Sequence, residues 1–318
     1  MTAANFELLR AVGAVADNPA DAAAVARALD IPSLNRHEHA ELFVLNCPPY
    51  ASVFLGPDGA LGGEGTDRVA GFWRAIGLSP PAEPDHLAAL LSLYASLGEA
   101  ATQAGRPATA AILARSQAAL FWEHLWPWLP AYLDAITDLA IPAASAWAAV
   151  TRSALGAEAG RHRPPATLPL ALRAAPAAVT ANDADGLVTP LLIPVRSGRI
   201  LIRRGLAAAA GDTGTGYRIG ERQYALQAML AQDPHATLQW LTGEAARWAA
   251  RHARQPDPGP ASQWWTHRAR RTVRVLTGLA EQAADSTGAA LSGEAATHRV
   301  GMSVVQPPHG SRPRAQPR

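Results

Sequence analysis

Lysine is absent from this sequence, and all 28 basic residues are arginine. The glycine-rich phosphate loop of many nucleotide-binding proteins ends in Lys-Ser or Lys-Thr, so nucleotide binding of that kind is excluded. Cysteine occurs once, as Cys47, which excludes an internal disulfide framework and a thiolate metal cage. We expect Cys47 to pack as a small apolar side chain.

A long apolar run is also missing. No stretch of about eighteen uncharged apolar residues occurs, which is the length that a membrane-spanning helix needs. The first residues, Met1 to Glu7, lack the basic and apolar regions of a signal peptide. We therefore expect a cytoplasmic protein without membrane insertion. A length of 318 residues favours two structural units.

The formal net charge of +2 conceals an uneven distribution along the chain. Residues 1–150 contain 7 arginines and 15 acidic residues, a net charge of −8. Residues 151–318 contain 21 arginines and 11 acidic residues, a net charge of +10. An acidic half attracts cationic partners and slows the approach of nucleic acid.

The N-terminal half is predicted to be a series of helices, because helix start and stop residues recur and no segment alternates like a strand. Asn18 predicts the N-cap of a helix over residues 19–29. Thr66 is the predicted N-cap of another helix, which ends at Gly77. A long helix is predicted over residues 107–126. Further helices are predicted to begin at Leu87, Pro130 and Pro142. The expected fold class is an all-α helical bundle.

The segment around residues 160–181 is rich in arginine, proline and alanine and cannot build much of a core, so we place a domain boundary there. The predicted units are a helical core over 1–158, a Pro/Ala-rich linker over 159–181, a mostly helical basic module over 182–300 and a disordered tail over 301–318. Within the module, the apolar runs 191–195 and 200–202 are candidates for a small hairpin, although Pro194 argues against the first run. Helices are expected at 221–230, 236–253 and 264–284.

Three unusual segments follow one another in the N-terminal half: Pro49-Tyr50-Ala51-Ser52, Glu83-Pro84-Asp85-His86 and Phe121-Trp122-Glu123-His124-Leu125. Together they resemble the TorD/DmsD/NarJ family of redox-enzyme maturation chaperones, over roughly residues 36–155. Many members place a residue between the proline and the aspartate, whereas here Pro84 directly precedes Asp85. The resemblance implies a TorD-like helical bundle that holds an apo-molybdoenzyme and its twin-arginine signal peptide until the cofactor is in place. The C-terminal module has no firm counterpart in that family.

The turn at residues 83–86 is the first candidate binding site. A carboxylate and an imidazole side by side at a helix N-terminus, as in Asp85 and His86, can hydrogen-bond an extended peptide and pair with an arginine fork. The resemblance implies a role of this turn in signal-peptide recognition. The structural alternative is that Asp85 caps or charge-complements the start of the following helix, while His86 is an ordinary surface or bridging residue.

Aromatic residues near these segments extend the candidate site. Tyr50 either plugs the core or lies on the rim of a peptide groove. Trp122 has helical spacing typical of the core, but a chaperone that grips an apolar peptide also needs an exposed groove, with His124 as the best polar candidate on its rim. The predicted peptide-binding set comprises Phe43, Tyr50, Ser52, Trp73, Glu83, Pro84, Asp85, His86, Trp122, Glu123 and His124.

A metallohydrolase is the least favoured alternative. The residues that suggest it are His37, His39, His86 and His124, with Glu38, Glu41, Asp85 and Glu123. His-x-His on a helix places the two rings about 200° apart, and no H-E-x-x-H pair supplies two ligands on one face. We therefore predict no metal, no cofactor and no enzymatic activity.

The basic run over residues 267–274 raises a third class of function. Its four arginines are Arg268, Arg270, Arg271 and Arg274. A nucleic-acid contact or a general helical adaptor would use such a run, but a solvated helix face or a surface for an acidic partner is the commoner explanation. Arg203 and Arg204 look like a twin-arginine signal, but their internal position argues against export.

These observations favour a cytoplasmic, non-enzymatic chaperone. Its expected partners are the catalytic subunit of a molybdopterin-containing oxidoreductase and the signal peptide of that subunit, with no nucleic acid. The basic second half is expected to bind either the client enzyme or the acidic first half of its own chain. The sequence is also compatible with a homodimer.

Overall fold

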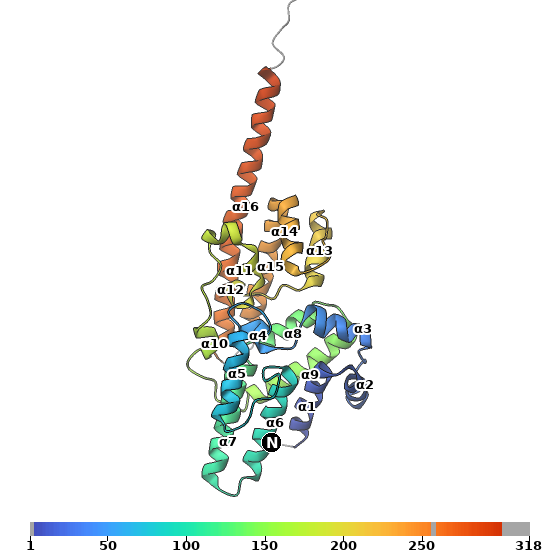
Figure 1. Cartoon of the computed structure of the whole chain (residues 1–318), viewed down its shortest axis with the longest axis vertical. Coiled ribbons are helices and arrows are strands. Elements are labelled where there is room, and N and C mark those ends of the chain that lie inside the picture. Colours follow the sequence, from blue (N-terminus) through green and yellow to red (C-terminus); the bar gives the residue numbers. More distant parts are fainter. Residues whose placement is uncertain (1–2, 256–258, 301–318) are drawn as a thin grey trace, which may run out of the picture.

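The computed structural model describes residues 3–255 and 259–300 of the chain. Within these residues the chain forms sixteen α-helices, with short π- and 3-10-helical segments and no strand (Figure 1). The predicted all-α class is therefore confirmed. The predicted disordered tail at 301–318 lies outside the described residues.

The N-terminal half is a bundle built around α1 and α6. Its helices are α1 (Ala3–Asp17), α2 (Pro19–Ala28), α3 (Arg36–His39), α4 (Ala51–Leu55), α5 (Gly63–Ala75), α6 (Leu87–Gln103), α7 (Pro107–Leu120), α8 (Leu129–Thr137) and α9 (Pro142–Ala159). Two π-helical segments, η1 (Ala40–Asn46) and η2 (Phe121–Leu125), follow α3 and α7. Helix α6 packs against α1 on one side and α7 on another, so the bundle is held by neighbouring antiparallel helices (Figure 1).

Most predicted helix starts in this half are confirmed, because they depend on local hydrogen bonding. The Asn18 side chain accepts a hydrogen bond from the Ala20 N–H at 2.9 Å, and Pro19 occupies the first position of α2. Two boundaries are wrong. Helix α5 begins at Gly63 and not after Thr66, and the helix predicted over 107–126 becomes π-helical after Leu120.

The C-terminal half is also helical. Its elements are α10 (Leu170–Arg173), η3 (Ala181–Gly186, a 3-10 segment), α11 (Val188–Leu192), α12 (Pro194–Ser197), α13 (Arg203–Thr213), α14 (Arg222–Gln232), α15 (Pro234–Arg254) and α16 (Ala261–Val300). The hairpin predicted from 191–195 and 200–202 is wrong. Pro194 at the first position and left-handed Gly198 at the C-cap close a short helical turn, α12, between the two apolar runs.

The main hydrophobic core crosses the predicted domain boundary. It contains Trp128 and Trp147 from the N-terminal bundle and also Leu172, Trp248 and Trp265 from beyond residue 159. A second, smaller core lies entirely beyond that residue, between helices α11, α13, α14, α15 and α16. The division into a core and a module remains a prediction, and the shared core shows that the two predicted parts are packed closely together.

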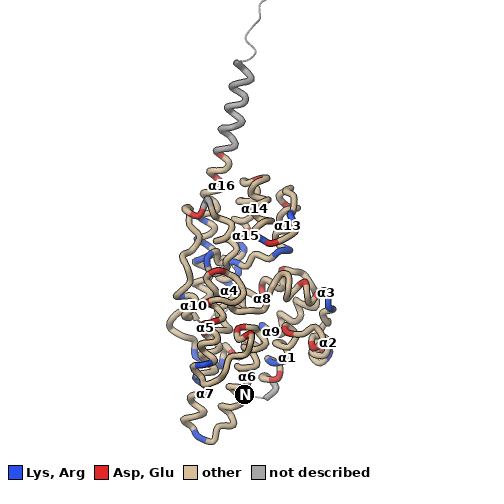
Figure 2. Tube along the Cα trace, viewed as in Figure 1, with Lys and Arg blue, Asp and Glu red and all other residues tan. Residues whose placement is uncertain are grey.

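Direct polar contacts also join the two halves. The Trp265 indole N–H donates to the Pro127 carbonyl at 2.7 Å. Arg251 forms a bidentate pair with Asp138 at 2.6 and 2.5 Å, from which Arg247 lies 3.7 Å away. Figure 2 shows blue arginine segments around α15, whereas red acidic segments are scattered over the N-terminal helices. The basic half therefore binds part of the chain's own acidic half.

Among the described helices, none combines the length and the apolar character that crossing a bilayer requires.

Helix α15 runs beside α16, and both pack against the rest of the C-terminal half (Figure 1).

Candidate functional site

The turn at residues 83–86 is joined to the segment at 49–52 by backbone hydrogen bonds. Tyr50 and His86 form an isolated antiparallel bridge. On either side of it, the Ala51 N–H donates to the Asp85 carbonyl at 3.0 Å, and the Leu87 N–H donates to the Pro49 carbonyl at 2.8 Å. Two of the three segments noted in the sequence therefore form one unit.

The carboxylate of Asp85 is buried inside this unit, with 2% of its surface exposed. One oxygen accepts the Ser52 N–H at 2.9 Å, and the other accepts the Thr66 hydroxyl at 3.0 Å. Gly65 makes this approach possible, because a Cβ there would lie 2.8 Å from the Ser52 Cα. Asp85 thus holds the start of α4, and not the start of α6 as the structural alternative supposed.

His86 provides the cap of α6 in place of Asp85. Its Nδ1 accepts the Ala88 N–H at 3.2 Å, and its ring meets the Tyr50 ring edge-on at 4.8 Å between centroids. His86 is 6% exposed and is not a surface residue. Burial lowers the pKa of His86 below its ordinary value, so the neutral ring that this cap requires is favoured.

The accessible edge of the turn is formed by other residues. Glu83 is exposed and Tyr50 is half-buried. Burial, followed by a hydrogen bond with the Glu83 carboxylate, raises the pKa of Tyr50 to about 12. The negative charge of Asp17 also acts on Tyr50 and His86, although Asp17 lies at the end of α1. An acidic edge around an aromatic ring can attract a guanidinium group.

Helix α5 lies between the turn and the aromatic segment η2. The indole N–H of Trp73 donates to the Pro84 carbonyl at 3.3 Å, and the neighbouring Phe72 ring lies 5.0 Å from the His124 ring. The structure thus brings the turn and η2 to two sides of one helix. The sequence does not reveal that Thr66 and Phe72 of α5 contribute to the site, because their partners Asp85 and His124 are distant in the chain.

Most of η2 faces the core. Trp122 and His124 are 6% and 7% exposed, so neither lies on an open rim as the sequence suggested for His124. Burial, reinforced by the charge of Arg68, lowers the pKa of His124 to about 4. Glu123 is only half-buried and accepts the Leu170 N–H at 2.7 Å. The polar group that η2 presents outward is therefore Glu123.

Phe43 and Ser52, two other members of the predicted peptide-binding set, are also buried. Phe43 packs edge-on against Trp147 at 5.4 Å, and Ser52 is fully buried within α4. Of the predicted set, Tyr50, Trp73, Glu83 and Glu123 keep accessible surface.

A buried polar cluster near the end of α9 was not predicted. The Tyr94 hydroxyl donates to Glu158 at 2.6 Å and lies 2.6 Å from His162 Nε2. Glu158 is fully buried and also accepts from Asn5 and Arg161. The residues of this cluster come from α1, α6, α9 and the segment after α9, so no local sequence pattern predicts it.

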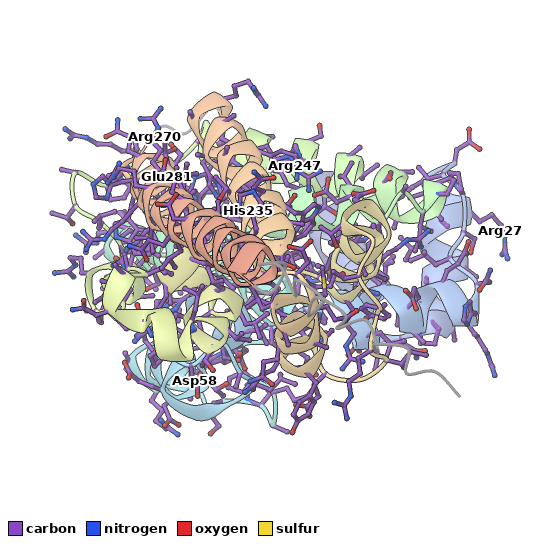
Figure 3. The ribbon with its side chains drawn as sticks, turned by 90° about the horizontal axis from the view of Figure 1, so that it is seen from above. Arg27, Asp58, His235, Arg247, Arg270 and Glu281 are labelled. Atoms are coloured by element: carbon purple, nitrogen blue, oxygen red, sulfur yellow. The ribbon has the colours of Figure 1, made fainter. Side chains whose placement is uncertain are left out.

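The Arg-rich run of α16 divides into bound and exposed residues. Arg268 lies over the Trp264 ring at 4.6 Å and donates to the Pro176 carbonyl at 2.7 Å. Arg270 and Arg274 are exposed, and Arg270 lies at the outer edge of the molecule in Figure 3. Among the described residues, no three His, Cys, Asp or Glu side chains come together in a way that could hold a metal ion.

Comparison with known proteins identifies one family. Residues 10–134 match the family model described as nitrate reductase delta subunit. This stretch covers less than half of the chain but includes the turn at 83–86, helix α5 and η2. No curated protein and no solved structure matches the chain.

Proposed function

We propose a specific chaperone function, because residues 10–134 match the model of the nitrate reductase delta subunit family, a family of redox-enzyme maturation chaperones and not of catalytic enzymes. The chain binds the twin-arginine signal peptide and the apo form of the catalytic subunit of a molybdoenzyme. It keeps that subunit in the cytoplasm, open to cofactor loading, before export. The observation that carries the proposal is the family match over the segment that contains the turn at 83–86.

The accessible edge of the turn supports the binding of a cationic peptide. Exposed Glu83 lies beside the half-buried Tyr50 ring, and Asp17 adds a second negative charge nearby. A guanidinium group stacks on an aromatic ring and pairs with a carboxylate, so this edge suits the arginines of a leader. Buried Asp85 and His86 contribute indirectly, because they hold Tyr50 and Glu83 in place.

Calorimetry with a synthetic leader peptide tests the proposal. The peptide carries two adjacent arginines followed by an apolar stretch rich in alanine and leucine. We expect micromolar or tighter binding, about −8 kcal/mol. Glu83→Gln should weaken this binding by about 1 kcal/mol, as expected for one partly exposed charge pair.

Glu281→Gln is the matched control, since Glu281 is an exposed carboxylate on α16 (Figure 3). It should leave the affinity unchanged. Equal affinity for a peptide whose two arginines are replaced by glutamine would contradict the charge part of the proposal, and no measurable binding of either peptide would contradict peptide binding itself.

A further inference from the structure

The segment between α9 and η3, residues 160–180, is here called the strap. It leaves the end of α9, passes the side of the molecule near α5 and continues to α11 (Figure 1). It contains one short helical turn, α10, and otherwise little regular structure. Nevertheless, Ala171 and Leu172 of the strap are 2% and 1% exposed and belong to the main core.

Both ends of the strap are fixed by side-chain contacts. At the first end, Arg161 pairs with Glu158 at 2.8 Å, and His162 meets the Tyr94 hydroxyl at 2.6 Å. At the second end, the Pro176 carbonyl accepts from Arg268 at 2.7 Å, and the Ala177 carbonyl accepts from Arg196 at 3.0 Å. These anchors would remain if the middle of the strap moved away.

The middle of the strap lies on the predicted peptide-binding segment η2. The Leu170 N–H donates to the Glu123 carboxylate, while the Leu170 side chain is 48% exposed. The contact is therefore made through the backbone, which any peptide can offer. Next to Glu123, the buried Trp122 indole N–H has no hydrogen-bond partner among the described residues.

The order of residues in the strap is similar to that of an export leader. Arg161 and Arg163 are followed by Pro-Pro-Ala-Thr-Leu-Pro-Leu-Ala-Leu. Basic residues followed by an apolar stretch is also the order of residues in an export leader. The apolar part of the strap supplies Leu172 to the core, whereas Arg163 and Arg173 remain exposed.

We propose that the surface around Glu123 is a binding surface for a leader-type peptide and that the strap occupies it as an internal stand-in, which the peptide displaces. This inference rests on the proposed peptide-binding function and adds the surface around Glu123 to the edge at Glu83 and Tyr50. It also implies regulation. The apparent dissociation constant equals the intrinsic one divided by the fraction of molecules with an open strap, so a closed strap weakens peptide binding.

Hydrogen exchange on the wild-type chain tests the displacement directly. The probe is the synthetic peptide with two adjacent arginines and an alanine- and leucine-rich stretch, added at saturation. The amides of Leu170, Leu172 and Ala174 should then exchange at least about tenfold faster, because the peptide replaces the strap. If the peptide binds and these amides keep their protection, the inference is overturned while peptide binding stands.

A pair of variants tests the competition. Leu172→Ala removes a buried contact of the strap and should tighten peptide binding by about tenfold, since the open fraction rises. Leu170→Ala changes an exposed side chain on the same turn and should change affinity by less than about twofold. Faster strap exchange in Leu172→Ala without tighter binding would overturn the inference.

The two proposals fail in different ways. Absence of peptide binding to both the wild type and Leu172→Ala would contradict the proposed function itself. If Leu172→Ala does not fold, the exchange experiment on the wild type still decides between displacement of the strap and binding elsewhere.

Discussion

At the scale of single residues, the acidic and histidine side chains of the candidate site have two different roles. Asp85 and His86 are structural, since their polar atoms bind the start of α4 and the start of α6. Glu83 is exposed and can meet a partner at the edge of the site, whereas Glu123 is half-buried and accepts the Leu170 N–H. Asp85 and His86 therefore hold the turn in place, and neighbouring residues such as Glu83 form its accessible surface.

Substitution of Asp85 tests this separation. Asp85→Ala should lower the free energy of unfolding by about 2–4 kcal/mol, because it leaves the buried Ser52 N–H without an acceptor and removes the bond to Thr66. Urea unfolding monitored by circular dichroism measures this loss. Glu83→Gln is the control and should change stability by less than about 0.5 kcal/mol. An Asp85→Ala protein of unchanged stability would show that the carboxylate is not a structural anchor.

His124 gives the protein a predictable sensitivity to acid. Its pKa is about 4 in the folded state against 6.5 for an ordinary histidine, so the unfolded chain binds a proton more readily between these values. The contribution of neutral His124 to the free energy of unfolding is complete above about pH 6.5. It is lost as the pH falls toward 4, by up to roughly 3 kcal/mol. His252 has a similarly lowered pKa of about 4 and acts in the same direction.

Unfolding free energies measured at intervals between pH 7.5 and 4.5 check this prediction. His124→Leu should flatten the fall in stability over that window, because one of the groups that bind protons on unfolding is gone. A slope identical to that of the wild type would mean that His124 is not buried as a neutral ring.

At the scale of elements, local start and stop signals explain most helices, but close packing between elements depends on single glycines. Gly198 ends α12 with φ +72°, and a Cβ there would lie 2.2 Å from the Ala269 N of α16. Its carbonyl also accepts from His252 Nε2 at 3.0 Å. Helix α12 therefore touches α16 backbone to backbone.

Two glycine substitutions separate backbone strain from this close approach. Gly198→Ala should destabilise the protein by about 3 kcal/mol or more, since the methyl group adds a steric clash to the left-handed conformation. Gly214 has a similar φ of +69° at the end of α13, but a Cβ there would have no neighbour within 4 Å. Gly214→Ala should therefore cost only about 1–2 kcal/mol. Equal losses in thermal unfolding would contradict a tight α12–α16 contact.

At the scale of the whole molecule, the two predicted parts are packed on one another through a shared core and through charge pairs. Trp265 of α16 reaches the Pro127 carbonyl, and Arg251 of α15 holds Asp138. Some of the opposite charges of the two halves are thus paired with each other inside the molecule. In the proposed function, exposed arginines such as Arg270 would meet an acidic surface of the client.

A fragment of residues 1–158 tests the predicted division of the chain. It retains Glu158 and the turn at 83–86, but it uncovers the surface that Leu172, Trp248 and Trp265 bury in the complete chain. We expect a helical fragment with a lower melting temperature that binds a hydrophobic dye. Calorimetry and dye fluorescence measure both properties. A fragment as stable as the complete chain, without dye binding, would show that the N-terminal bundle is energetically independent.

The sequence by itself determined the helical class and most helix starts, because a cap such as Asn18 or a proline such as Pro142 acts on the backbone within one turn. The short apolar runs around Pro194 were misjudged, since strands and buried helical turns share that pattern.

Only the tertiary structure decided what the notable polar residues do. The partners of Asp85 are 33 and 19 residues away, and the partner of Glu123 is 47 residues away. Neither pairing leaves a periodic signal in the sequence. Folding brought these segments together through burial of the shared core, so burial and long-range hydrogen bonds made Asp85 an anchor and left Glu123 beneath the strap.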